Sequence, residues 1–268
     1  MSALPYTVTD SMTMLRRNLR HMRRYPSLTL FIAGMPVVFL LLFVYVLGGT
    51  LGAGLVAGTG ITGGRDQYIA YVVPGILVIT VAGAAQGTAL SMAMDMASGI
   101  IARFRTMAIA RASVLTGHVL GSVIQTMLAV AIVTGVALLI GFRPTTEPIY
   151  WLAAAGLIAL VALAISWLSV ALGLVTDNVE TASNLPMFLI ILPLLSSGFV
   201  PTNSMPGPLA WFADNQPFTP IIETLRGLLL GTPIGNSAAL AVGWCLLISA
   251  LSYVWARRLY DRNSAKAA

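Results

Sequence analysis

The sequence has few charged residues, one cysteine and one lysine, and each scarcity excludes a class of protein. Only 9% of the 268 residues are charged and 57% are hydrophobic, and the mean hydropathy of +0.88 lies far outside the range of soluble globular domains. Cys245 stands alone, which excludes a disulfide within the chain. Lys266 is the only lysine, so the Gly-Lys-Ser/Thr end of a phosphate-binding loop is missing. The composition indicates an integral membrane protein without an ATP site of this kind.

Residues that carry catalysis or ion coupling are also missing from the apolar stretches. The two histidines, His21 and His118, lie in or beside basic segments, so no serine is paired with a histidine inside a bundle. No group of His, Cys, Asp and Glu has the spacing of a metal site. No Asp, Glu or Lys lies in the middle of a stretch, where ion-coupled carriers usually place one. We therefore expect no catalytic residue, and no cofactor or metal bound by the chain itself. The neutral polar residues within the stretches, Gln86, Gln125 and Ser166, are expected to form hydrogen bonds that pack helices together.

Six apolar stretches remain between the charged residues, and they predict an all-α membrane protein with six transmembrane helices. A helix needs about 20 apolar residues to cross about 30 Å of hydrocarbon. The six stretches are residues 28–47, 68–92, 119–142, 149–175, 185–200 and 234–255. The fifth is short and contains Pro186 and Pro193, so we expect it to be irregular where protein, and not lipid, satisfies its backbone. Residues 210–230 are also apolar, but three charged residues and two prolines exclude them as a span.

Arginines set the expected orientation of these stretches, because Lys and Arg in short loops stay on the cytoplasmic side of a membrane. With six crossings, Arg65, Arg143 and Arg226 fall on one side, and the other twelve of the 15 basic residues fall on the opposite side. Both termini and residues 95–118 are therefore predicted to be cytoplasmic. Residues 12–24 combine apolar residues at helical spacing with arginines on the other side, which predicts an amphipathic helix at the inner interface. A basic flank that only sets topology is the alternative interpretation.

One segment between the second and third stretches differs from its surroundings. Residues 95–118 read DMASGIIARFRTMAIARASVLTGH, and they alternate arginines with apolar residues. In a helix, one stripe would hold Ile100, Phe104, Met107 and Arg111, and the other sides would hold Arg103 and Arg105. An apolar stripe with basic flanks suits docking into a partner's groove. A helix that only rests on anionic lipid is the alternative.

Two segments carry a resemblance to a known family. SGIIARFRTMAIARASVLTGHVLG resembles the first cytoplasmic loop of ABC-2 exporter permeases of the daunorubicin-resistance type, and LSSGFVPTNSMPGPLAWFADNQPFTPIIETLRGLLLG resembles their last extracellular segment. The resemblance covers the whole chain in order. It implies a single ABC-2 type transmembrane domain over residues 1–268, with a cytoplasmic interfacial helix (1–27), a six-span bundle (28–256) and a cytoplasmic tail (257–268). It also implies a second permease, the same or related, and two separately encoded ATP-binding subunits that hold ATP and Mg²⁺.

The same resemblance assigns roles to individual residues. The family's coupling helix, which contacts the ATPase, corresponds to Gly99, Arg103, Phe104, Arg105, Met107 and Arg111. This chain departs from the family at Ala108, where proline is usual, and at His118, where a basic residue is usual. Residues 176–184, TDNVETASN, correspond to the second cytoplasmic loop and contain Asp177 and Glu180. Read from the residues alone, Asp177 and Glu180 resemble a capping box that opens the fifth span.

Residues 201–232 correspond to short re-entrant helices on the outer face of the family. We expect a helix from Pro220 to Leu230, with Pro220 in its first turn. Glu223 and Arg226 lie three residues apart, so they could pair with each other or with a neighbouring chain. The residues expected to form this outer gate are Pro217, Pro220, Glu223 and Arg226.

These expectations describe a plasma-membrane permease subunit that exports a hydrophobic or amphipathic compound (a drug, lipid or secondary metabolite) and binds no nucleic acid. Its ATPase is on a partner chain, so the chain itself is not an enzyme. The large apolar residues of the spans suit a hydrophobic drug, lipid contact or core packing equally; they are Phe31, Phe39, Phe43, Met92, Trp167, Met187 and Phe188. The alternative functions are a membrane-anchored assembly or recruitment protein without transport, and an ion-coupled secondary carrier.

Overall fold

The structure of the chain is a computed structural model. It describes residues 16, 24, 26–50, 64–97, 111–144, 147–176 and 178–266. These ranges contain helices and turns but no strand. Hydrocarbon offers no water to exposed backbone groups, and a helix satisfies those groups within itself. The all-α prediction is therefore confirmed for the part of the chain that the structure describes.

Long helices match five of the six predicted spans within these ranges. They are α2 (Pro26–Leu41, continued by the π-helical turn Leu42–Leu47), α4 (Arg65–Ala97), α6 (Arg111–Leu139), α7 (Pro148–Val175) and α12 (Ser237–Lys266). The parts long and apolar enough to cross a membrane are Thr29–Thr50, Arg65–Ala97, Leu115–Leu139, Pro148–Val175 and Ser237–Arg262. These segments overlap the first four predicted stretches and the sixth.

The fifth predicted stretch is irregular, as its two prolines indicated. It consists of α8 (Val179–Asn184), a 3-10 turn (Leu185–Met187) and α9 (Phe188–Leu194), after which the chain turns through residues 195–199. Pro186 lies in the 3-10 turn and Pro193 lies just before the end of α9. Since Val179–Leu194 is shorter than the five long helices, a sixth helix of full spanning length is not found among the described residues.

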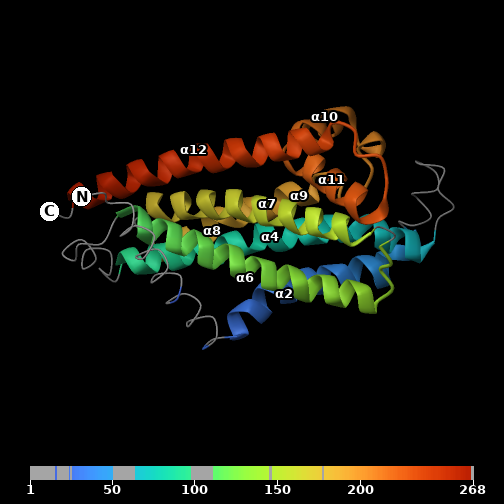
Figure 1. The fold of residues 1–268 in the computed structure, drawn as a ribbon, viewed down its shortest axis with the longest axis horizontal. Helices are drawn as coiled ribbons and strands as arrows, with labels where there is room; N and C mark the ends of the chain where they lie inside the picture. Colours follow the sequence, from blue (N-terminus) through green and yellow to red (C-terminus); the bar gives the residue numbers. More distant parts are fainter. Residues whose placement is uncertain are drawn as a thin grey trace.

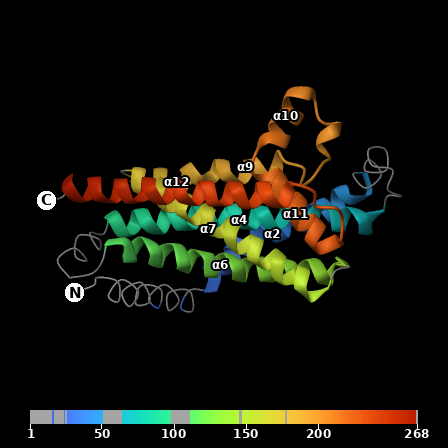
Figure 2. The same cartoon turned by 45° about the horizontal axis from the view of Figure 1, so that its top comes forward.

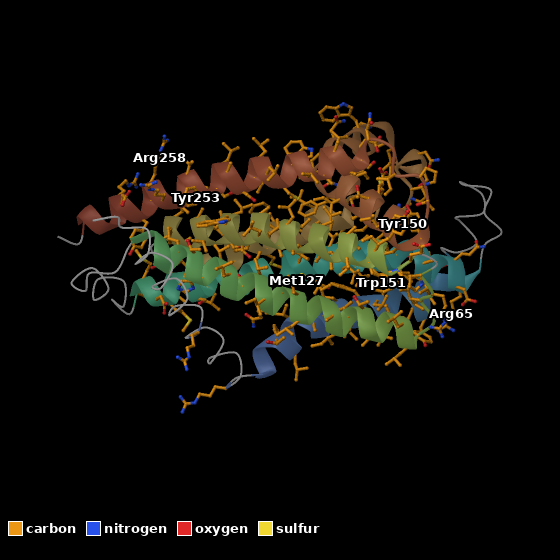
Figure 3. All side chains as sticks on the ribbon, viewed as in Figure 1. Arg65, Met127, Tyr150, Trp151, Tyr253 and Arg258 are labelled. Carbon is orange, nitrogen blue, oxygen red and sulfur yellow. The ribbon has the colours of Figure 1, made fainter. Side chains whose placement is uncertain are left out.

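The helices form one elongated bundle (Figures 1 and 2). Helices α4 and α7 occupy its interior and are mostly buried, whereas α2, α6 and α12 keep much of their surface exposed. Arg65 and Arg258 lie at opposite ends of the bundle (Figure 3), and we refer to these as the Arg65 end and the Arg258 end. From the end of α7, the α8–α9 segment runs back toward the Arg65 end (Figure 1).

Two short helices lie toward the Arg65 end, and the first of them projects from the side of the bundle (Figure 2). They are α10 (Gly207–Asn215) and α11 (Phe218–Leu230), and a 3-10 turn (Thr202–Ser204) precedes them. Neither is long enough to cross a membrane. This confirms that residues 210–230 do not form a span.

The core has two hydrophobic clusters with a hydrogen-bonded layer between them. The smaller cluster lies toward the Arg258 end and consists of Met92, Leu115, Val119, Trp167, Val170, Ala171, Leu174, Ala256 and Tyr260. The larger cluster joins α2, α4, α6, α7, α9, α11 and α12. At the boundary, the hydroxyl of Ser166 donates to that of Ser122 over 3.1 Å, and Ser122 is also hydrogen-bonded to Thr88. These three buried hydroxyls join α4, α6 and α7, so each finds a partner without water.

Helix α4 touches the backbone of its neighbours at two levels. A Cβ at Gly173 of α7 would lie 2.6 Å from the carbonyl oxygen of Ala89, and a Cβ at Gly75 would lie 2.9 Å from the carbonyl oxygen of Gly198. Side chains do not fit in such contacts, and glycine lets the backbones approach. Helix α4 is therefore closely packed against α7 and, nearer its start, against the turn that follows α9.

Candidate functional site

The predicted ATPase-coupling residues fall mostly outside the described residues. Gly99, Arg103, Phe104, Arg105 and Met107 lie between α4 and α6, and their roles stay predictions. Arg111 is the first residue of α6. Of the predicted N-terminal helix, Arg16 and Arg24 are described, and both are exposed.

The helices on either side of the predicted coupling segment are joined by a contact between an aspartate and a histidine side chain. Nε2 of His118 in α6 lies 3.1 Å from Oδ2 of Asp95 in the last turn of α4. Both side chains are well removed from solvent, at 8% exposed for His118 and 14% for Asp95. The sequence marked His118 only as a departure from the family pattern.

The second predicted cytoplasmic segment begins differently from the capping box expected there. Helix α8 starts at Val179, so Asn178 occupies the cap position, and its side chain makes no capping hydrogen bond. Glu180 lies in the first turn and is exposed, while Asp177 is outside the described residues. A glutamate in the first turn still matches the positive end of the helix dipole.

Helix α4 is buried on all sides through its middle but opens on one side toward the Arg258 end. From Val72 to Ala82 every residue is buried. Beyond this point Gly83 and Leu90 are partly exposed, and Gly87, Ser91 and Met94 are exposed. Their spacing of three or four residues places them on one side of the helix.

A second stripe follows the α8–α9 segment. Five of its exposed residues recur at helical spacing, and they are Thr181, Asn184, Met187, Phe188 and Ile191. Nε2 of Gln86 in α4 donates to the hydroxyl oxygen of Ser183 in α8 over 3.3 Å, so the two segments meet beside both stripes. We call the two stripes together the open face; it comprises Gly83, Gly87, Ser91 and Met94 of α4 and the five residues of α8–α9. Its mixture of small, polar and apolar side chains suits a ligand with both polar and apolar parts.

The structure sorts the large apolar residues that the sequence left undecided. Met92 and Trp167 are buried in the smaller cluster, and Phe39 and Phe43 pack against the larger one. Phe31, on α2, is 75% exposed, and Met187 and Phe188 are exposed on the open face. Only the last two therefore lie where a ligand of the open face could contact them.

Toward the Arg65 end, the turn at residues 195–199 closes against α4. Gly198 lies against Gly75, as described above. The ring of Phe199 packs against that of Phe43 in α2, with centroids 4.7 Å apart. The turn therefore packs closely against α4 near the start of that helix, whereas the exposed stripe of α4 lies nearer the Arg258 end.

Polar groups from α4 and α11 satisfy the carbonyl oxygens of this turn. Nη2 of Arg226 donates to the carbonyl oxygen of Ser197 over 2.8 Å and to that of Tyr71 over 3.3 Å. The Tyr71 hydroxyl also donates to the Ser197 carbonyl oxygen over 2.8 Å. The guanidinium carbon lies 3.9 Å from the centroid of the Tyr71 ring. Because a cation near the end of a helix also compensates the negative end of its dipole, Arg226 stabilises the chain where α9 stops.

Two further residues complete this network. Nε2 of Gln216 donates to the carbonyl oxygen of Leu195 over 2.7 Å, and the Thr219 hydroxyl oxygen accepts from the backbone N–H of Ser197 over 3.4 Å. The expectation that protein satisfies the backbone of the fifth stretch is therefore confirmed at this turn. We call Arg226, Tyr71, Gln216, Thr219 and the turn at 195–199 the outer network, after the side of the membrane that the sequence predicts for it.

The predicted gate residues all lie on or beside α11. Pro217 precedes the first residue of the helix, and Pro220 is buried in its first turn, as expected. Glu223 and Arg226 have different partners within the chain, because Glu223 Oε2 accepts from the Ser237 hydroxyl over 2.9 Å. Arg226 instead binds backbone carbonyls. The intrachain pairing considered from the sequence is therefore not found, because the guanidinium lies within hydrogen-bond distance of the carbonyl oxygens of Ser197 and Tyr71.

Sequence reasoning missed several of these residues. Tyr71, Gln216 and Thr219 carried no signal beyond a polar atom near a proline-interrupted stretch. The interpretation of Gln86, Gln125 and Ser166 as helix-packing residues is confirmed, since each hydrogen-bonds a different helix.

The sequence of the chain is similar to those of several known proteins. The sequence profile of the family described as ABC-2 type transporter matches residues 9–230. The daunorubicin resistance ABC transporter permease protein DrrB1 of Streptomyces coeruleorubidus is 29% identical over 264 residues, which cover 96% of this chain and 88% of that protein. The probable doxorubicin resistance ABC transporter permease protein DrrC of Mycobacterium tuberculosis is 25% identical over 170 residues, which cover 63% of this chain and 62% of DrrC.

Proposed function

This chain belongs to the ABC-2 type transporter family, and from that premise we propose that it is the permease subunit of an exporter driven by a separate ATPase. Two ATP-binding subunits hold ATP and Mg²⁺, and a second permease, identical or related, completes the transporter. The exported compound is hydrophobic or amphipathic. The membrane is the plasma membrane.

The observation that carries this proposal is the contrast between the two ends of α4. Its side is open toward the Arg258 end, at Gly87, Ser91 and Met94. Toward the Arg65 end the same helix is closed by the turn at 195–199. A transporter that alternates access needs one end open while the other is closed. In the proposed assembly the substrate enters along the open face, a second permease covers that face, and the outer network separates to release the substrate.

The proposed orientation places the Arg258 end in the cytoplasm, together with both termini. The α8–α9 segment then makes the sixth crossing, because it leads from the end of α7 toward α10 and α11 (Figure 1). After α9 ends, the outer network binds backbone groups of the turn at 195–199. These groups therefore do not face lipid without a hydrogen-bond partner.

Cysteine labelling tests the orientation and the sixth crossing together. In a Cys245→Ser background, Arg65→Cys should react with an impermeant thiol reagent in intact cells. Arg103→Cys and Arg258→Cys should react only after permeabilisation, because cytoplasmic residues are shielded from the reagent. If Val179–Leu194 did not cross, Arg258→Cys would be labelled from outside as Arg65→Cys is. Outside labelling of Arg103→Cys would invert the orientation.

Transport measurements test the function and the open face. Inside-out vesicles that contain the chain and its co-purifying ATP-binding subunit should accumulate daunorubicin only when ATP is present. Gly87→Trp should lower this uptake about tenfold, because the indole would occupy part of the proposed path, and a cost of about 1–3 kcal/mol is enough for such a change in rate. Gly243→Trp is the matched control, since Gly243 is also an exposed helical glycine with nothing within 4 Å of its Cβ position, but it lies on α12. It should transport as the wild type does.

Two results would contradict the proposal. The chain would be a recruitment protein if an ATPase co-purified with it but no vesicle uptake of any tested amphipathic drug depended on ATP. It would be an ion-coupled carrier if an ionophore abolished uptake while the ATP concentration was held constant. Equal loss of uptake in Gly87→Trp and Gly243→Trp would show that the open face is not part of the transport path.

A further inference from the structure

The pair formed by Asp95 and His118 joins the end of α4 to the start of α6. Asp95 is in the last turn of α4, and His118 is in the second turn of α6. The 3.1 Å contact between Oδ2 and Nε2 is the distance of a hydrogen bond. It ties together the two helices between which the predicted coupling residues Arg103 and Phe104 are located.

The surroundings of the pair hold these helix ends in one unit. Asp95 lies between Met92 and Met96, and His118 lies between Leu115 and Val119; these four neighbours all belong to or pack against the smaller hydrophobic cluster. That cluster also includes residues of α7 and α12. In it, the rings of Trp167 and Tyr253 meet edge to face with centroids 4.9 Å apart. The pair is therefore placed at the edge of a packed region that contains parts of four helices.

Burial makes this contact sensitive to the loss of either partner. The side chains of His118 and Asp95 are 8% and 14% exposed, so a hydrogen bond to water would only partly replace the bond between them. Losing a hydrogen bond between two side chains that are this well removed from solvent is more damaging than losing one at the surface.

We propose that Asp95 and His118 are positioning residues that fix the spacing of α4 and α6, so that a displacement of the coupling segment moves both helices together. This inference rests on the proposed function, because it requires an ATPase that acts on that segment. Neither residue touches ATP or the exported compound. Their role is to transmit motion from the docked ATPase to the bundle.

The test uses the complete complex of permease and ATPase in proteoliposomes. Asp95→Asn and His118→Gln should keep the co-purifying ATPase, the basal rate of hydrolysis and the KM for ATP. The daunorubicin-stimulated kcat should fall about tenfold, a size typical of residues that couple two sites. His118→Arg should retain stimulation, because a cation can still bind Asp95. The exchanged variant D95H/H118D should recover part of it. Gln125→Leu removes a neutral contact between α6 and α2 and should behave as the wild type.

The outcomes separate this inference from the function it rests on. If the wild-type complex showed no drug-stimulated hydrolysis and no ATP-dependent uptake, the proposed function itself would fail. If the wild type were stimulated and Asp95→Asn and His118→Gln were stimulated equally, the positioning role would be wrong. Loss of the co-purifying ATPase in these variants would also overturn it, because the pair would then be needed for docking and not for transmission. Failure of His118→Arg together with His118→Gln would exclude charge pairing as the cause.

Discussion

Arg226→Ala should abolish daunorubicin export while leaving the ATPase bound to the permease. The guanidinium makes two hydrogen bonds to backbone carbonyls and stacks on Tyr71. Hydrogen bonds to charged groups contribute about 1.5–3 kcal/mol each, and a desolvated cation–π contact contributes about 2 kcal/mol. Part of this gain is offset by the cost of removing arginine from water, so we expect a net loss of about 3 kcal/mol from the outer closure. ATP-dependent vesicle uptake and the thermal midpoint of the purified complex are the measurements.

A graded series makes this prediction specific to the guanidinium. Arg226→Lys keeps a charge but cannot stack and bind two carbonyls at once, so export should be intermediate. Tyr71→Phe removes one neutral hydrogen bond, with an expected cost of about 1 kcal/mol. Glu223→Gln is the control within α11, because its amide oxygen can still accept from Ser237. Wild-type export and an unchanged thermal midpoint for Arg226→Ala would show that the closure does not depend on this residue.

Phe104→Asp should prevent recruitment of the ATPase without affecting membrane insertion. A central aromatic anchor typically contributes about 2 kcal/mol or more to an interface, which is about 30-fold in affinity. An aspartate also places an unpaired charge in a surface expected to be apolar. Pull-down of the ATP-binding subunit and the amount of permease in the membrane fraction measure the two effects separately.

Neighbouring arginines provide the comparison for Phe104. Arg103→Ala and Arg105→Ala should each weaken binding less, and mainly at high salt, because charges at the rim of an interface act mostly on association rate. Arg258→Ala, which the sequence predicts to lie on the same side of the membrane, controls for a general loss of basic charge. Normal recruitment by Phe104→Asp would assign the segment to the lipid surface instead.

The spans were predictable because membrane crossing leaves a strong signal in composition. A run of apolar residues with charges only at its ends has few alternatives to a helix in lipid. The interruption of the fifth stretch was predictable for the same kind of reason, since Pro186 and Pro193 each remove a backbone donor. The start of that segment was placed too late, because residues 179–184 are polar and resemble a loop. They form α8, which exposes Glu180, Thr181 and Asn184 and buries Ala182.

The partners of Arg226 were not predictable in the same way. Helical spacing predicts Glu223 as a partner of Arg226, because the two residues lie three positions apart. The acceptors that Arg226 binds are main-chain oxygens of Tyr71 and Ser197, far away in the sequence. Any residue type supplies such an oxygen, and its availability depends on where a helix ends in space. The pair of Asp95 and His118 was hidden for a related reason: charges at span ends are common, and only packing shows which of them meet.

Because α4 is one continuous helix, a movement at Asp95 also moves Gly75. The helix runs unbroken for 33 residues, and at about 1.5 Å per residue Gly75 and Asp95 lie about 30 Å apart along it. Tilting a rod of that length by about 5° displaces its far end by about 2–3 Å. At Gly75 the neighbouring carbonyl leaves no room even for a methyl group, so a displacement of this size separates the two backbones by roughly the diameter of one atom. A small change in the tilt of α4 at the Arg258 end therefore becomes a larger displacement at the Arg65 end, about one membrane thickness away. There it would separate the backbones of Gly75 and Gly198.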